Sequence, residues 1–232
     1  MGSLCALKEH GSPGAVGGNH GRGAAGAGGG MRELSLFSGA GGGLLGSKLL
    51  GWKTIGYVEF NDYCQRVIAQ RIKDGIFDDA PIFGDIRAFI REGYAAVYQG
   101  MVDVITAGFP CQPFSVAGKR RGEDDERNMW PETIKCIRII RPRFALLENV
   151  PALLAHRYGR RIFGDLAESG YDCKWRVLSA AELGAPHKRD RLWILAYAKS
   201  INRRNVGKDA TNGAGRESGN EFNAGGKVVE DA

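Results

Sequence analysis

The chain is 232 residues long and carries a net charge of +6, with a sequence pI of about 9.1. This length can hold one α/β domain with a proper core and is short for two full-sized domains. No apolar run approaches the roughly 18 residues of a membrane span, and the N-terminus lacks the compact apolar stretch of a secretory signal. The lack of such a run excludes a membrane-spanning helix. The excess of basic over acidic residues weakly favours a polyanionic partner.

The five cysteines, Cys5, Cys64, Cys111, Cys136 and Cys173, form an odd set without a CxxC pair. This pattern is not the short, dense one of a disulfide scaffold, and we expect neither disulfides nor a metal site. A reducing cytoplasm is the expected location.

Three regions differ in composition. Residues 1–30 are dominated by Gly and Ala and are expected to be disordered, because they cannot bury enough apolar surface to offset the entropy of ordering. Since Met31 stands directly before the first patterned segment, an upstream start codon or a vector-like extension would explain this leader. Residues 31–198 are expected to form one folded domain, and residues 199–232, rich in Asn, Gly and charge, a polar linker or the start of an incomplete region.

From residue 31 onwards, short apolar runs alternate with amphipathic stretches, which is typical of repeated βα units around a mostly parallel sheet. Strands are expected at residues 33–37, 53–58, 102–107 and 144–147, and helices at residues 44–50, 62–72 and 132–140. Asp62 is expected to cap the second of these helices. Two later runs, residues 171–178 and 191–197, lie close enough in sequence to pair as an antiparallel extension. The expected fold class is therefore α/β, with an antiparallel strand near the end of the sheet.

The first strand runs into a glycine turn, residues 37–43, which opens a helix. Such a turn lets the backbone approach a ligand closely and presents helix N-terminal amides. Leu44 stands where a dinucleotide fingerprint has its third glycine, so the turn alone is as readily structural as cofactor-binding. Glu59, about twenty residues on at the end of the next strand, favours a cofactor site, because an acid there can accept both ribose hydroxyls. A solvated strand-end glutamate is the alternative.

Asp85 follows Gly84 at the tip of a third strand and precedes a helix. An Asp in this position is usually a helix cap. Its carboxylate could instead accept from an adenine amino group while Ile86 packs on the ring, an interpretation that depends on the other motifs.

Residues 108–115 read Gly-Phe-Pro-Cys-Gln-Pro-Phe-Ser and are the most informative segment. Two prolines rigidify a loop directly after an apolar strand, at the edge where α/β sheets hold their ligands. A lone cysteine is more often a small buried hydrophobe than a nucleophile, but this loop argues against burial of Cys111. The basic run at residues 119–121 would favour a thiolate, its alternative being a solvated surface patch.

Taken together, these motifs resemble those of the DNA cytosine-C5 methyltransferase family. Its members share, in this order, an FxGxGG cofactor loop, a PCQ nucleophile loop, an ENV tripeptide and a QxRxR basic motif. The first three stand here as residues 37–42, 110–112 and 148–150, and the fourth as residues 187–191 with His187 in place of the usual Gln. The resemblance covers residues 31–197 and implies a Rossmann-like S-adenosylmethionine-dependent methyltransferase fold, with helices on both faces of the sheet.

The resemblance implies that Cys111 attacks C6 of a cytosine flipped out of double-stranded DNA, and that S-adenosylmethionine donates the methyl group. Glu148 would contact the N3 edge, Arg191 the cytosine carbonyl, and Arg189 the nucleophile loop and a nearby phosphate. A strand-end carboxylate paired with an arginine, and two arginines on one face of an exposed strand, are the structural alternatives. The other implied residues are Phe37, Ser38, Gly39, Gly41, Gly42, Glu59, Phe60, Asp85 and Ile86 for the cofactor, and Pro110, Gln112 and Ser115 for the substrate.

Family members continue into a target-recognition region and a closing helix, and neither is found in residues 199–232. We therefore expect either the catalytic half of a split enzyme, with a complementary C-terminal polypeptide, or a truncated product, encoded by a prokaryote or phage. Two other functions stay open. An RNA cytosine-C5 methyltransferase uses the same flipped-base chemistry. A truncated, non-catalytic remnant would only bind cofactor or a partner chain.

Overall fold

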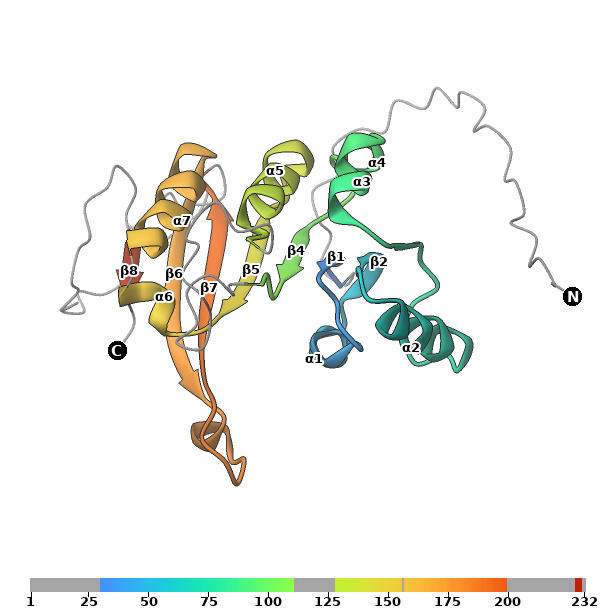
Figure 1. The fold of residues 1–232 in the computed structure, drawn as a ribbon, viewed down its shortest axis with the longest axis horizontal. Coiled ribbons are helices and arrows are strands. Elements are labelled where there is room, and N and C mark those ends of the chain that lie inside the picture. The colour runs from blue at the N-terminus through green and yellow to red at the C-terminus, as the bar shows by residue number, and fades with distance from the viewer. Residues whose placement is uncertain (1–29, 111–127, 156, 200–227, 231–232) are drawn as a thin grey trace, which may run out of the picture.

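The computed structural model describes residues 30–110, 128–155, 157–199 and 228–230. Within them, eight strands form one sheet in the order β3-β2-β1-β4-β5-β7-β6-β8 (Figure 1). The strands are β1 (Arg32–Leu36), β2 (Lys53–Val58), β3 (Ile82–Phe83), β4 (Val104–Ala107), β5 (Phe144–Asn149), β6 (Tyr171–Ser179), β7 (Asp190–Ala198) and β8 (Val228–Glu230). The helices are α1 (Gly42–Leu49), α2 (Asp62–Lys73), α3 (Ile86–Arg91), α4 (Tyr94–Val97), α5 (Trp130–Ile140), α6 (Ala152–Ala155) and α7 (Arg157–Glu168). None of these helices has the length and apolar character needed to cross a bilayer.

The pairing directions confirm the α/β fold class. Strands β1 to β5 pair in parallel, whereas β7 is antiparallel to both β5 and β6. Each strand and helix expected from the sequence forms, with ends displaced by no more than two residues. The expected antiparallel pair is also present, and its second strand, β7, is the one that lies against β5. Residues 228–230 add β8, parallel to β6, where the sequence indicated no element.

The two faces of the sheet are covered by different helices. Leu34 and Leu36 of β1 belong to the main core, to which α5 contributes Ile137 and α7 contributes Ile162. A smaller cluster on the other side joins α1, α2 and β2 through Leu44, Tyr57, Ile68 and Phe77. Helices therefore pack on both faces, as expected, and α1 and α2 lie beside β1 and β2 at one end of the sheet (Figure 1).

Helix α2 is capped by Asn61, so the expected cap at Asp62 is wrong. The Asn61 side chain accepts hydrogen bonds from the backbone N–H groups of Tyr63 and Cys64, at 3.0 and 3.1 Å. Asn61 has the extended backbone that a cap requires, whereas Asp62 is already the first helical residue. The Asp62 carboxylate instead places negative charge in the first turn, near the positive end of the helix dipole.

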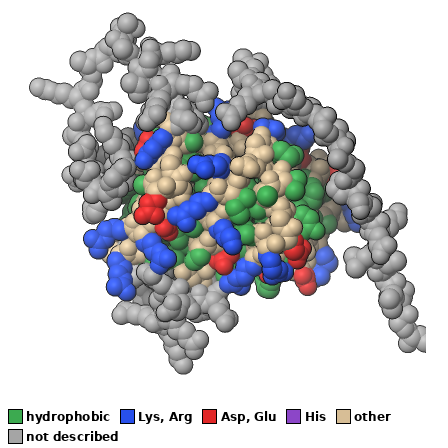
Figure 2. Space-filling view, turned by 90° about the horizontal axis from the view of Figure 1, so that it is seen from above, with side chains coloured by type: hydrophobic (Ala, Val, Ile, Leu, Met, Phe, Trp, Pro, Cys, Tyr) green, Lys and Arg blue, Asp and Glu red, His purple; other side chains and the backbone are tan. Residues whose placement is uncertain are grey.

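Basic side chains are numerous on one end of the molecule. Figure 2 shows the end opposite to the β6–β7 hairpin, where Lys and Arg side chains lie across much of the visible described surface and Asp and Glu are fewer. Because basic side chains are scattered over this end, charge alone does not locate a binding site for a polyanion on it.

The amino ends of β1 and β4 are joined by Asp103, which directly precedes β4. Its carboxylate accepts from the Arg32 backbone N–H at 3.0 Å and from the Arg32 guanidinium at 3.1 Å. Burial opposes ionisation of this carboxyl, but the hydrogen bonds and charge of Arg32 outweigh burial. The pKa of Asp103 is therefore lowered below its ordinary value.

We predict that Asp103→Asn lowers the free energy of unfolding by about 1 kcal/mol at neutral pH, because the paired carboxylate is lost. Since the folded-state pKa is depressed, the stabilisation is present above the ordinary carboxyl pKa and disappears as pH falls through the folded-state pKa. Urea unfolding of both proteins should show the difference shrinking in acid. Glu92→Gln, which removes a half-exposed carboxylate beside Arg91, is the control. An undiminished difference in acid would contradict this account.

Candidate active site

β1 leads into a tight loop, residues 37–41, from which α1 begins. Gly41 has a φ of 95°, and an added Cβ there would lie 2.6 Å from the ring of Phe77, so only glycine fits. On the first turn of α1, a Cβ added at Gly42 or Gly43 would meet nothing within 4 Å. The loop is therefore closely packed on one side and open on the other, where a ligand can approach the helix.

Glu59 directly follows β2 beside this loop and is only 8% exposed. One carboxylate oxygen accepts from the Gly39 N–H at 2.6 Å, and the other accepts from the Asn61 N–H at 2.8 Å. Glu59 thus fixes the glycine loop against the end of β2. Each carboxylate oxygen can accept more than one hydrogen bond, so both keep an acceptor position that suits a pair of hydroxyl groups.

The other residues expected beside a cofactor adenine differ in their surroundings. Asp85 caps α3 by accepting from the Arg87 N–H at 2.8 Å, which is the structural alternative given for it above. Ile86 is 4% exposed and packs in the main core, so little of its side chain is open to a ring. Phe60 is 78% exposed at the same edge of the sheet and is accessible to a planar ligand.

A pocket of about 510 Å³ lies between the start of α1 and the strands β4, β5 and β7. It brings together residues from three separate motifs: Phe37, Ser38, Gly42, Glu148, Arg189 and Arg191. Thr106, Leu146 and Trp193 also line it and were not among the expected site residues. Glu59 and Asp85 are not in its lining and belong to the β2–β3 side of β1.

Glu148 and Arg191 form an ion pair at the edge of this pocket. Arg191 Nε lies 2.7 Å from Glu148 Oε1, and the two side chains are 26% and 31% exposed. The structural alternative for Glu148, a strand-end carboxylate paired with an arginine, therefore describes its state here. Because both partners line the pocket, the pair also presents a donor and an acceptor to anything that enters.

The segment expected to carry the nucleophile is only partly described. Pro110 is exposed after β4, and residues 111–127, which include Cys111, Gln112 and Ser115, lie outside the described residues. The start of the segment is fixed by Asn149, whose buried side chain donates to the Phe109 carbonyl at 3.1 Å. Asn149 was not among the expected site residues, and its place beside Glu148 in the tripeptide is the one signal that could have indicated it.

Two other cysteines are excluded as nucleophiles by their surroundings. Cys136 and Cys173 are buried, and burial raises the pKa of both thiols to about 12. A thiol with so high a pKa stays protonated near neutral pH and is unreactive.

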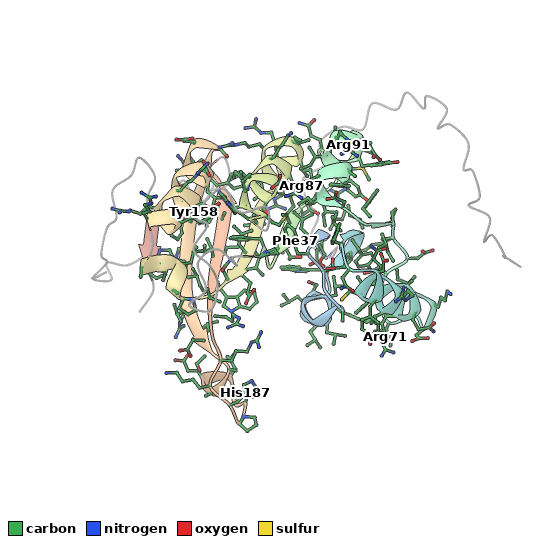
Figure 3. All side chains as sticks on the ribbon, in the orientation of Figure 1. Phe37, Arg71, Arg87, Arg91, Tyr158 and His187 are labelled. Carbon is green, nitrogen blue, oxygen red and sulfur yellow. The ribbon has the colours of Figure 1, made fainter. Side chains whose placement is uncertain are left out.

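The basic motif lies along β7 and the hairpin that precedes it. Arg189 and Arg191 both line the pocket. His187 instead lies at the far end of the hairpin, away from the sheet (Figure 3). The hairpin is closed near Arg189 by a backbone bond from Ala180 N–H to the Arg189 carbonyl at 3.1 Å. His187 is therefore not among the described residues that line the pocket.

The chain is similar to known proteins over most of its length. The family model described as C-5 cytosine-specific DNA methylase matches residues 31–223. The type II methyltransferase M.NgoMIV of Neisseria gonorrhoeae is 34% identical over 168 residues, which cover 71% of this chain and 51% of that protein. M.CviJI of Paramecium bursaria Chlorella virus IL3A is 33% identical over 172 residues, covering 73% of this chain and 44% of that protein. The chain thus spans about half the length of these relatives.

Solved structures show the same fold. A DNA modification methyltransferase encoded within an E. coli prophage superposes with a TM-score of 0.59 at 26% identity, over 74% of this chain and 48% of that one. The S. pombe Dnmt2 methyltransferase gives a TM-score of 0.58 at 21% identity, over 72% of this chain and 51% of that one, and shows likeness of fold alone. With most of its length matched by the family model, the chain belongs to the C-5 cytosine-specific DNA methylase family.

Proposed function

We propose that residues 31–198 form the catalytic domain of a DNA cytosine-C5 methyltransferase, acting in the cytoplasm of a prokaryotic or phage-infected cell. The methyl group passes from S-adenosylmethionine to C5 of a flipped-out cytosine in double-stranded DNA. The observation that carries this proposal is the Glu148–Arg191 pair, which faces a pocket bounded by the glycine loop and the end of β4.

The residues around the glycine loop fit the cofactor that the family uses. When bound, S-adenosylmethionine supplies an electrophilic methyl group on a sulfonium. Glu59 is proposed to accept the ribose hydroxyls, Asp85 to accept the adenine amino group with the oxygen that does not cap α3, and Phe60 to pack on the adenine. The rest of the cofactor would lie against the loop backbone on the open side of α1, along Phe37, Ser38, Gly39, Gly41 and Gly42.

The chemistry at the base is proposed to begin with the Cys111 thiolate, which forms a bond to C6 while the electron pair moves toward C5. Arg191 donates to the cytosine carbonyl, and Glu148 in its protonated form donates its proton to N3, which offsets negative charge that builds on the ring. These two side chains are bonded to each other through Arg191 Nε and Glu148 Oε1, so the other carboxylate oxygen and the other guanidinium N–H groups would meet a base that enters. After C5 takes the methyl group, loss of the C5 proton and then of the Cys111 thiolate restores the aromatic ring.

The nucleophile can be tested by trapping. Duplex DNA containing 5-fluorocytosine has no C5 proton to lose, so with S-adenosylmethionine the chain should accumulate a covalent protein–DNA adduct. Cys111→Ala should abolish the adduct. Cys136→Ala and Cys173→Ala should retain it, since burial keeps those thiols protonated. An adduct that persists in Cys111→Ala would refute the assignment, and trapping by a matched RNA alone would favour an RNA-directed enzyme.

The cofactor site can be tested by calorimetry. Glu59→Ala should weaken S-adenosylmethionine binding by about 1 to 3 kcal/mol, because it removes acceptors for the ribose and releases the Gly39 amide. Glu92→Ala, at a half-exposed surface carboxylate, is the control and should bind as the unaltered chain does. Unchanged affinity in a folded Glu59→Ala variant would count against this site.

A complementary polypeptide is part of the proposal, because the chain spans 51% and 44% of the two relatives described above. Apolar side chains are exposed on α1 and β7, two elements that contribute residues to the pocket. Leu45 and Leu49 of α1 are 50% and 90% exposed, and Trp193 and Leu195 of β7 are 36% and 38% exposed. Exposed apolar side chains on neighbouring elements are suited to contact with a further protein segment. The proposed polypeptide would cover these residues and supply target recognition.

We therefore predict that the isolated chain methylates DNA weakly and without sequence preference. Its basic side chains still attract phosphates, an attraction that falls steeply with salt, while the proposed polypeptide would supply the contacts to base edges. Transfer of a tritiated methyl group, followed by bisulfite sequencing, measures both rate and position. Robust methylation at one short defined sequence by the 232-residue chain would show that recognition does not need a second polypeptide.

A further inference from the structure

Glu33 is a buried carboxylate inside the sheet that the proposed chemistry does not use. It lies in β1, and 1% of it is exposed. Three hydroxyl groups donate to it: Ser47 of α1 at 2.8 Å, Thr106 of β4 at 2.6 Å and Thr54 of β2 at 2.9 Å. Strands covered on both faces are ordinarily apolar, and a buried carboxylate is tolerated only when it is hydrogen-bonded. This cluster therefore replaces apolar packing between α1 and the sheet with directional bonds.

The bonds are divided unequally between the two carboxylate oxygens. Oε1 accepts from both Ser47 and Thr106, so one atom bridges α1 and β4. Oε2 accepts from Thr54, whose own backbone N–H is held separately by Asp78 at 2.9 Å. Only the Oε1 bonds connect α1 directly with β4.

Both bridged elements lead to parts of the proposed site. The glycine loop runs directly into α1, and Ser47 lies on that helix. Thr106 is the last residue but one of β4, which leads through Gly108 into the segment that contains Cys111. A displacement of α1 would thus move the cofactor loop, and a displacement of β4 would move the nucleophile segment. The shared oxygen limits relative movement of the two.

We propose that Glu33 is a positioning residue that holds the cofactor loop and the nucleophile strand at a set separation through Oε1. Its consequence for methyl transfer rests on the proposed function, whereas the coupling between α1 and β4 does not. A change at one end of the bridge should therefore alter the other end, which is not expected of a residue that only stabilises the core.

Amide hydrogen exchange of the whole chain tests this coupling without any ligand. Ser47→Ala should speed exchange in residues 104–110, and Thr106→Val should speed it in residues 39–45, by about two- to tenfold as expected for loss of one hydrogen bond. Thr54→Val removes a bond to the same carboxylate and is the matched control. It should lower the melting temperature but leave both segments exchanging as in the unaltered chain.

Two substitutions at Glu33 separate positioning from simple stability. Glu33→Gln keeps one oxygen that can accept from both Ser47 and Thr106. Amide exchange in residues 39–45 and 104–110 should therefore stay close to that of the unaltered chain. Glu33→Met fills similar volume without an acceptor and should speed exchange in both. If Glu33→Met does not fold, Ser47→Ala and Thr106→Val still decide the outcome.

Calorimetry links the bridge to the cofactor. Ser47 is not in the pocket lining, so weaker S-adenosylmethionine binding by Ser47→Ala, about two- to tenfold, would reflect displacement of the loop. Exchange changes of equal size in Thr54→Val, or changes confined to the substituted element in each variant, would overturn the proposal. If the unaltered chain binds no S-adenosylmethionine, the proposed function fails, while the exchange measurements still decide whether Glu33 couples α1 to β4.

Discussion

The parallel pairing of β1, β4 and β5 is the constraint on which the site depends. Leu36 pairs with Ala107, and Ala107 with Leu147, so these three strands reach the same level of the sheet. The residues that follow these three paired positions are Phe37, Gly108 and Glu148, in that order. Because the carboxyl ends of parallel strands lie at one edge of a sheet, strand pairing alone brings motifs that are far apart in the sequence together there. The 510 Å³ pocket lies at this edge.

The antiparallel strand β7 completes the site from the opposite direction. It enters the sheet between β5 and β6, with Trp193 opposite Glu148, which places Arg191 close enough for the 2.7 Å ion pair. Neighbouring strands lie about 4.8 Å apart, so a sheet with β6 next to β5 would put this arginine one strand farther away. The order of the last strands therefore determines whether the basic motif meets the carboxylate.

Three residues that we propose to bind ligands also form bonds within the chain. Glu59 fixes the glycine loop, Asp85 caps α3, and Glu148 neutralises Arg191. Each group is thus already hydrogen-bonded before a ligand arrives, which keeps partly buried carboxylates satisfied. Under the proposed function, binding would add to these bonds at Glu59, Asp85 and Glu148. The structural alternatives and the functional assignments are therefore compatible for these side chains.

The sequence by itself determined the strands and helices with strong periodicity and the order of the motifs, because both depend on residues a few positions apart. We did not predict α7 from the sequence, although its buried residues Tyr158, Ile162 and Leu166 recur at a four-residue spacing that is typical of a helix. Nor could it show that β7 lies beside β5, or that Glu33 bridges α1 and β4. Strand order and buried hydrogen bonds join residues distant in the chain, and their energies depend on how the whole sheet packs. Only the tertiary structure decides them.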